Sequence, residues 1–175
     1  MVERVIMNAA EISRALSRIA TQIIEANKGA KNVVLVGVLE RGAPLAERLS
    51  KLIGDIEKTK VPFGSMDVSM HRDDLAEKGK EIEVRRSELQ FSVDDKVVVL
   101  VDDVIFAGRT VRAAMDSLND YGRPSKIQLA VLVDRGGRDL PIHPDFVGKQ
   151  ITASKTDKVM VNLKETDGAD KVIVK

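Results

Sequence analysis

Short apolar runs alternate along the chain with stretches of helical spacing. The runs 33–38, 97–101 and 127–133 are rich in branched residues and contain few polar ones. Runs of this length and composition are typical of strands buried on both faces of a parallel sheet. Apolar residues at helical spacing predict helices over 43–53 and 109–121. The alternation predicts an α/β fold with a parallel-rich central sheet flanked by helices.

A further helix is predicted to begin after Asn8. Asn8 and Glu11 have the spacing of a capping box, and Gly29 marks the end of the helical pattern. An apolar stripe lies between these signals at Ile12, Leu16, Ile19 and Ile23.

The remaining segments carry weaker signals. Residues 61–70 predict extended chain, and the polar segment 71–81 predicts a hairpin or lid. Residues 134–150 are expected to be rich in loops, whereas 159–163 and 171–174 are expected to form closing strands.

Composition limits the possible classes of protein. The 175 residues, 43% of them apolar, suit one domain over residues 1–175 with a substantial core. No apolar run approaches the roughly 20 residues of a membrane helix, so no membrane partner is expected. The absence of cysteine excludes disulfides and thiol nucleophiles, and we expect a cytoplasmic protein. A net charge of +1 means that any RNA contact needs a local basic patch.

The segment 97–110 carries the strongest chemical signal. Asp102 and Asp103 follow the apolar run, and Gly108 and Thr110 lead into a helical pattern. Ligands of open α/β sheets bind beyond the carboxyl ends of the strands. Adjacent carboxylates there can accept hydrogen bonds from vicinal ribose hydroxyls, and a glycine turn into a helix offers N–H groups to a phosphate. The segment therefore predicts a ribose 5-phosphate site.

Other sites can also use a strand that ends in two acids. A magnesium site of a nucleotide hydrolase or a receiver domain has this form, and so does a helix N-cap. A hydrolase needs a P-loop, but the nearest match, from Gly37 to Gly42, continues into Ala43 and Pro44, so the lysine and the hydroxyl are missing. A cap alone does not need two acids, a glycine and a threonine at this spacing. We favour the sugar-phosphate site.

Two arginines are candidates for the same edge of the sheet. Arg41 follows the strand 33–38, and its guanidinium could bind pyrophosphate in bidentate fashion; the alternative is a surface arginine beside the turn glycine Gly42. Arg72 begins the polar stretch, which could close over the site and exclude water, or could be a solvated loop.

Basic residues elsewhere suggest contacts with a nucleic acid. Arg14, Ser17 and Arg18 share one face of the first helix, which could contact phosphates or be a solvated polar face. Arg138 lies in a turn after the strand 127–133, where it could contact ligand or RNA phosphate or could simply be exposed. No histidine has a partner at metal-ligand spacing, so no metal site on protein side chains is expected.

The segment 97–110 closely resembles the phosphoribosyl pyrophosphate (PRPP) motif of type I phosphoribosyltransferases. Further segments, among them 72–75, 122–124 and 127–136, resemble bacterial regulators of pyrimidine operons that are also uracil phosphoribosyltransferases. The resemblance implies a type I fold with a small hood, and a homodimer or higher oligomer. It implies conversion of uracil and PRPP to UMP and diphosphate, with Mg²⁺ carried by the PRPP diphosphate. It also implies UMP-dependent binding to leader RNA, which attenuates transcription.

Together, the motif and the resemblance give each candidate residue a role. Asp102 and Asp103 are expected to hold the ribose hydroxyls, with Arg41 and Gly42 at the pyrophosphate and Arg72 on the lid. The 5-phosphate is expected at Phe106, Ala107, Gly108, Arg109 and Thr110, and RNA at Arg14, Ser17, Arg18, Arg138 and Lys149.

Several positions depart from the family pattern. Leu39 and Glu40 replace a basic residue and a threonine, and a carboxylate beside a diphosphate weakens binding. Two alternatives therefore stay open: a nucleotide-binding regulator with little catalytic activity, and a phosphoribosyltransferase for another base that has lost RNA binding. The other departures are Thr21, Ala26, His71, Gly137 and His143.

Overall fold

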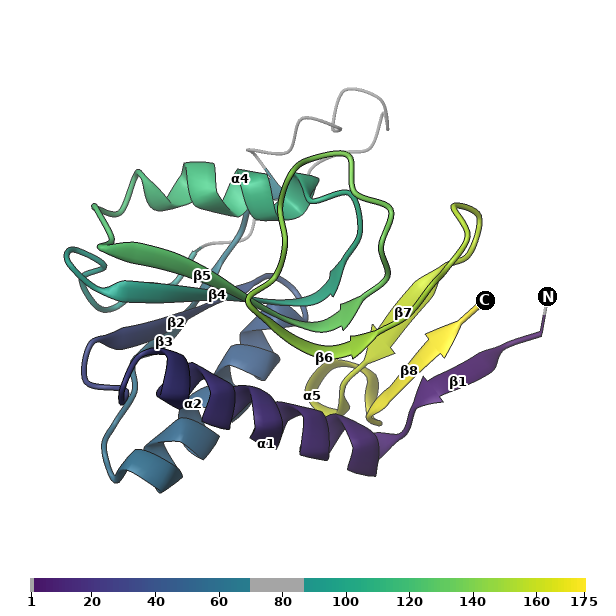
Figure 1. Ribbon diagram of the computed structural model, residues 1–175, viewed down its shortest axis with the longest axis horizontal. Coiled ribbons are helices and arrows are strands. Elements are labelled where there is room, and N and C mark those ends of the chain that lie inside the picture. Colours follow the sequence, from purple (N-terminus) through teal and green to yellow (C-terminus); the bar gives the residue numbers. More distant parts are fainter. Residues whose placement is uncertain (1, 70–86) are drawn as a thin grey trace.

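A parallel sheet of five strands forms the centre of the computed structural model, which describes residues 2–69 and 87–175 (Figure 1). The strand order is β3-β2-β4-β5-β6, and every neighbouring pair is parallel. All carboxyl ends therefore lie at one edge of the sheet. The strands are β2 (Val33–Val38), β3 (Phe63–Met66), β4 (Val97–Ile105), β5 (Lys126–Asp134) and β6 (Phe146–Gln150).

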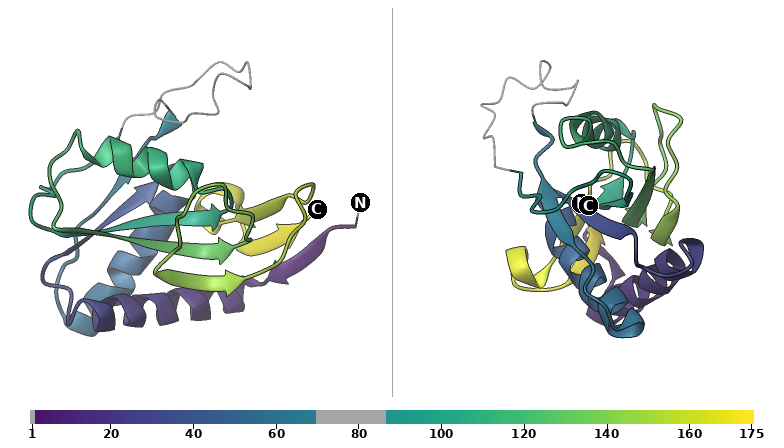
Figure 2. Two further views of the ribbon diagram at one scale, coloured as in Figure 1. Left: turned by 45° about the horizontal axis from the view of Figure 1, so that its top comes forward. Right: turned by 90° about the vertical axis from the view of Figure 1, so that its left-hand side faces the viewer.

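Helices cover both faces of this sheet (Figure 2). The helices α1 (Ala9–Ala26) and α2 (Gly42–Glu57) pack on one face, and α4 (Arg109–Leu118) packs on the other. Leu35 of β2 belongs to the core under α1 and α2, whereas the next residue, Val36, belongs to the core under α4. This alternation confirms the prediction of strands buried on both faces.

The start of α1 has the predicted capping box. The side chain of Asn8 accepts a hydrogen bond from the Glu11 N–H at 2.9 Å, and the Glu11 carboxylate accepts one from the Asn8 N–H at 2.8 Å. The apolar stripe of the helix is fully buried. Local capping and burial of one face therefore support the same helix.

A second, smaller sheet stands beyond the carboxyl ends of the parallel strands (Figure 2). It is antiparallel, with the order β1-β8-β7, and we call it, together with the short helix α5, the hood. The closing strands predicted at 159–163 and 171–174 are confirmed, although they pair in this separate sheet. The elements of the hood are β1 (Arg4–Met7), β7 (Val159–Asn162), α5 (Lys164–Asp167) and β8 (Lys171–Val174).

Some predicted boundaries were wrong. β4 runs four residues beyond Val101, because its pairing with β5 continues to Ile105. The segment 134–150, expected to be loop-rich, contains the edge strand β6. Among the described residues, none of the helices has the length and apolar character needed to cross a membrane.

The capping box leads to a stability prediction. Asn8→Ala removes the acceptor of the Glu11 N–H, and we expect the free energy of unfolding to fall by about 1 kcal/mol in urea denaturation. Asn8→Asp keeps an oxygen at the same place and should lose far less. Equal losses in the two variants would contradict the capping role.

Candidate active site

The turn after β2 lies unusually close to β4. A Cβ built on Gly42 would lie 2.3 Å from the carbonyl oxygen of Val101, and one on Gly37 would lie 2.3 Å from the carbonyl oxygen of Gly42. No side chain fits at either position, so glycine is required at both. The turn 39–41, whose Leu39–Glu40 peptide bond is cis, is thereby held beside the residue that precedes the acid pair.

The acid pair lies within β4, where the sheet loses one neighbour. Pairing of β4 with β2 ends at Val101, whereas pairing with β5 continues through Asp102. Asp102 is buried, with 7% of its surface exposed, and Asp103 is half-buried. The Asp102 carboxylate accepts the Asp103 N–H at 2.8 Å, and the Asp103 carboxylate accepts the Val104 N–H at 2.8 Å. Backbone donors thus fix the orientation of both carboxylates.

A glycine turn joins β4 to α4. Gly108 is buried, has a left-handed φ of 94°, and is the N-cap of α4. No hydrogen bond from a side chain caps this helix in the part of the chain that the structure describes. Ala107 and Thr110, on either side of the helix start, are half-buried. A helix start of this kind presents N–H groups and a positive dipole end to an anion.

Arg41 reaches across the site to the hood. Its Nε and Nη2 donate to the two carboxylate oxygens of Asp167 at 3.2 and 2.8 Å, and its Nη1 lies 3.8 Å from Glu40. The hydrogen bond from Arg41 lowers the pKa of Asp167. The same pair, helped by the charges of Asp103 and Glu40, raises the pKa of Arg41. Arg41, the residue predicted to bind pyrophosphate, therefore has carboxylates on several sides.

A second arginine, Arg48 within α2, anchors the same part of the hood. Arg48 donates to both oxygens of Glu165, at 2.7 and 2.5 Å, and to both oxygens of Asp170, at 2.9 and 2.8 Å. These hydrogen bonds lower the pKa values of both acids. Neither Arg48 nor the acids of the hood were predicted from the sequence. The partners are 117 and 122 positions apart, so no local pattern relates them.

The loop after β5 packs against the glycine turn. Arg138 donates to Asp134 at 2.7 Å and to the carbonyl oxygens of Phe106 and Ile142 at 3.1 and 2.7 Å. Gly137 packs closely against the Phe106 ring, since a Cβ on Gly137 would lie 2.4 Å from a ring carbon. The guanidinium of Arg138 thus holds this loop in place, and its side chain is only 14% exposed.

The predicted basic residues of α1 and β6 lie together. Arg14, Arg18 and Lys149 line one shallow depression of about 330 Å³. Arg18 donates to the carbonyl oxygens of Val147 and Gly148, and Lys149 donates to that of Ile6 at 3.0 Å. Ser17 is exposed on the same helix, whereas Arg138 does not line this depression.

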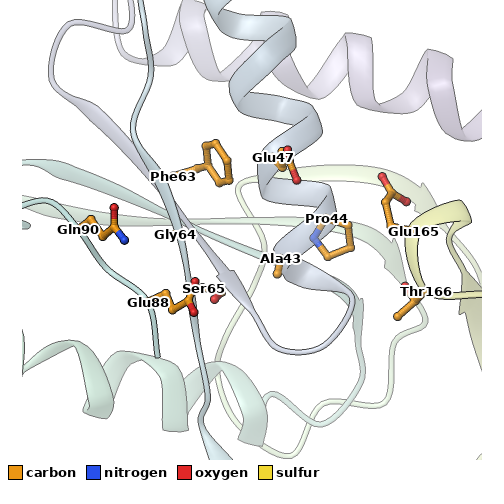
Figure 3. Close-up of a pocket in the computed structure, with 10 residues that line it drawn as sticks. All are labelled: Ala43, Pro44, Glu47, Phe63, Gly64, Ser65, Glu88, Gln90, Glu165 and Thr166. Carbon is orange, nitrogen blue, oxygen red and sulfur yellow. The ribbon is translucent and has the colours of Figure 1, made fainter. Parts of the chain in front are cut away.

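A separate cavity of about 450 Å³ lies between the start of α2, the edge strand β3 and α5 (Figure 3). Ala43 and Pro44 face Glu165 and Thr166 across it, and no residue of 102–110 lines it. Arg72 and the predicted lid lie outside the described residues. Across residues 2–69 and 87–175, no three histidine or acidic side chains are grouped as a metal site would require.

Residues 6–166 match the family described as phosphoribosyl transferase domain, and the chain belongs to this family. A bifunctional protein PyrR from Chloroflexus aurantiacus is 54% identical over 172 residues, which cover 98% of this chain and 94% of the relative. A bifunctional protein PyrR from Clostridioides difficile is 52% identical and covers 100% of this chain and 99% of the relative. Within the family, the chain groups with the bifunctional PyrR proteins.

Solved structures agree on the fold. A hypoxanthine phosphoribosyltransferase from Trypanosoma cruzi aligns with a TM-score of 0.74 at 21% identity, covering 98% of this chain and 90% of that one. One from Staphylococcus aureus aligns with a TM-score of 0.71 at 20% identity, covering 97% and 90%. The predicted type I phosphoribosyltransferase fold is confirmed.

The Arg48 network leads to a prediction about pH. The pKa values of Glu165 and Asp170 are lowered in the folded state. The Arg48 network therefore stabilises the protein at pH values above the ordinary pKa values of these acids, 4.5 and 3.8. This contribution is lost as the pH falls through the lowered values. Arg48→Met should lower the free energy of unfolding by about 1 to 2 kcal/mol at pH 7, and the deficit should shrink below about pH 4.

The measurement is urea denaturation from pH 7 to the lowest pH at which the protein stays folded. Lys175→Met is the matched control, because it removes an exposed pair with Glu3 at 3.4 Å and should cost far less stability than Arg48→Met. A deficit for Arg48→Met that stays constant with pH would contradict the network.

Proposed function

We propose that the protein is a uracil phosphoribosyltransferase that makes UMP and diphosphate from uracil and PRPP. One observation carries the proposal. The acid pair of β4 and the glycine turn before α4 lie at the carboxyl edge of the sheet, and Arg41, which follows the neighbouring strand β2, is paired there with Asp167 of the hood. Relatives of more than 50% identity over nearly the whole chain are named bifunctional protein PyrR, which supports the choice of this activity.

Each group then takes the role that its chemistry allows. Asp102 and Asp103 accept hydrogen bonds from the ribose hydroxyls, and residues 106–110 bind the 5-phosphate through backbone N–H groups and the start of α4. Arg41 and Gly42 lie at the diphosphate. Transfer breaks the bond between the ribose and the diphosphate, whose oxygen keeps the electron pair, and joins the ribose to a nitrogen of uracil, which loses its proton. The protein contributes orientation and stabilises charge on the departing diphosphate.

Magnesium fits this proposal as a companion of the substrate. Mg²⁺ prefers oxygen ligands and keeps several waters, so it is commonly held by one or two carboxylates together with substrate phosphates. In this proposal Mg²⁺ arrives bound to the diphosphate, and the Asp102 and Asp103 carboxylates remain with the ribose hydroxyls. Mg²⁺ would neutralise charge on the diphosphate, which matters beside Glu40 and Asp167.

The second part of the proposal is UMP-dependent binding to the leader RNA of a pyrimidine operon. The depression lined by Arg14, Arg18 and Lys149 supports it, because clustered cations are what a phosphate backbone requires in a chain of nearly neutral charge. Ser17 and Arg138 complete the proposed RNA-binding set. We further propose a cytoplasmic protein, in keeping with the absence of cysteine, and a homodimer or higher oligomer, as the resemblance implies.

A regulator with little catalytic activity is the second candidate. The observation that favours it is the pairing of Arg41 with Asp167, together with Glu40 at 3.8 Å. Two carboxylates beside Arg41, the residue proposed to bind the diphosphate, oppose binding of that anion. An assay of diphosphate release from PRPP with a panel of free bases separates this candidate from the enzyme, and it also tests other bases.

The acid pair gives the first functional prediction. Asp102→Asn with Asp103→Asn keeps the shape of both side chains but weakens two acceptors for the ribose hydroxyls. Turnover of uracil and PRPP should fall by more than about a hundredfold, while the circular dichroism spectrum and the melting temperature stay close to those of the wild type. Normal turnover of the double variant would rule out the assignment.

The basic depression gives the second functional prediction. Arg14→Ala should weaken binding of leader RNA in the presence of UMP and reduce the slope of log affinity against log salt by about 1. Arg112→Ala is the control, because Arg112 is an exposed cation of α4, on the other face of the sheet. An equal effect of both variants in gel-shift titrations would indicate net charge rather than this surface.

A further inference from the structure

Arg41 is held by a carboxylate from a distant part of the chain. Asp167 accepts from Nε and Nη2 of the same guanidinium edge, and the two residues are 126 positions apart. Asp167 is itself fixed, because its Oδ2 also accepts the Leu163 N–H at 2.9 Å. Both side chains are partly shielded, with exposed fractions of 29% and 20%. This is a built ion pair rather than a chance surface contact.

The geometry of this pair is the geometry in which a guanidinium binds a diphosphate. Arginine presents parallel N–H donors to two oxygens of a carboxylate or of a phosphate alike. A diphosphate that uses the Nε and Nη2 edge of Arg41 must therefore displace Asp167 or share its donors. The other edge of the Arg41 guanidinium is no more favourable for a diphosphate, because the Glu40 carboxylate lies 3.8 Å from Nη1.

We propose that Asp167 competes with the diphosphate of PRPP for Arg41 and so sets the relative affinity of the site for PRPP and for UMP. The inference rests on the proposed function. UMP has a single phosphate, which belongs at residues 106–110, and it needs nothing from Arg41. PRPP needs both residues 106–110 for its 5-phosphate and Arg41 for its diphosphate. A carboxylate on Arg41 therefore lowers the affinity for PRPP and leaves the affinity for UMP unchanged.

Asp167 of the hood can release Arg41 while the hood stays attached to α2. Arg48 holds Glu165 and Asp170 through four hydrogen bonds, about two turns of helix away from Arg41. These bonds fix α5 to α2 on either side of Asp167 in the sequence. Exchange of Asp167 for a diphosphate then needs only a side-chain movement. The competition is thus local to one ion pair.

The test is isothermal titration calorimetry of the full chain with PRPP and with UMP, each with Mg²⁺. Asp167→Asn removes the charge but keeps an oxygen that can accept the Leu163 N–H. We expect its dissociation constant for PRPP to fall about fivefold, and its dissociation constant for UMP to stay within about twofold of the wild type. Asp167→Ser, also neutral but with a shorter side chain, should change the affinity for PRPP in the same direction.

Asp170→Asn is the matched control, because Asp170 pairs with Arg48 of the same helix and not with Arg41. It should not tighten binding of PRPP. Unchanged or weaker PRPP binding by both Asp167 variants would overturn the inference, and so would an equal change for UMP, which would indicate a purely structural role. Wild-type protein that binds neither ligand would refute the proposed function itself, and the inference with it.

Discussion

A close backbone approach between the turn after β2 and the strand β4 determines the candidate site. It depends on two glycines, since a Cβ on Gly37 or Gly42 would collide with backbone atoms 2.3 Å away. The approach holds Arg41 beside the end of the β2–β4 ladder, which stops at Val101, whereas pairing of β4 with β5 continues through Asp102. A larger residue in the turn would separate the cation from the acid pair. The arrangement of charges therefore follows from backbone packing.

The hood completes this arrangement through ion pairs with α2. Arg41 is the N-cap of that helix and Arg48 lies about two turns further along, and both bind acids in or next to α5. Arg48 has two carboxylate partners and serves as the anchor. Arg41 shares its surroundings with Asp167, Glu40 and Asp103, so the site has carboxylates on several sides of one guanidinium. Binding of an anionic ligand must change this balance, and for this reason we regard Arg41 as the most responsive residue of the site.

Much of this fold was predictable because its signals are local. The capping box of α1, the branched runs of β2, β4 and β5, and the glycine turn into α4 each lie within a few neighbouring residues. β6 was missed because Phe146–Gln150 is a short edge strand with half-buried and exposed residues rather than a continuous apolar run. The Arg41–Asp167 pair joins residues 126 positions apart, and neither flanking sequence indicates the other. The partly buried environment of Arg138 is likewise a product of tertiary packing.

A crystal structure of the protein with bound UMP would show whether the acid pair and the glycine turn form the nucleotide site. We expect the phosphate within about 3 Å of backbone N–H groups of residues 107–110. We expect the two ribose hydroxyls at the carboxylates of Asp102 and Asp103, with Arg41 still paired with Asp167. A UMP phosphate bound away from the glycine turn, or a ribose without contact to either acid, would contradict this assignment of the site.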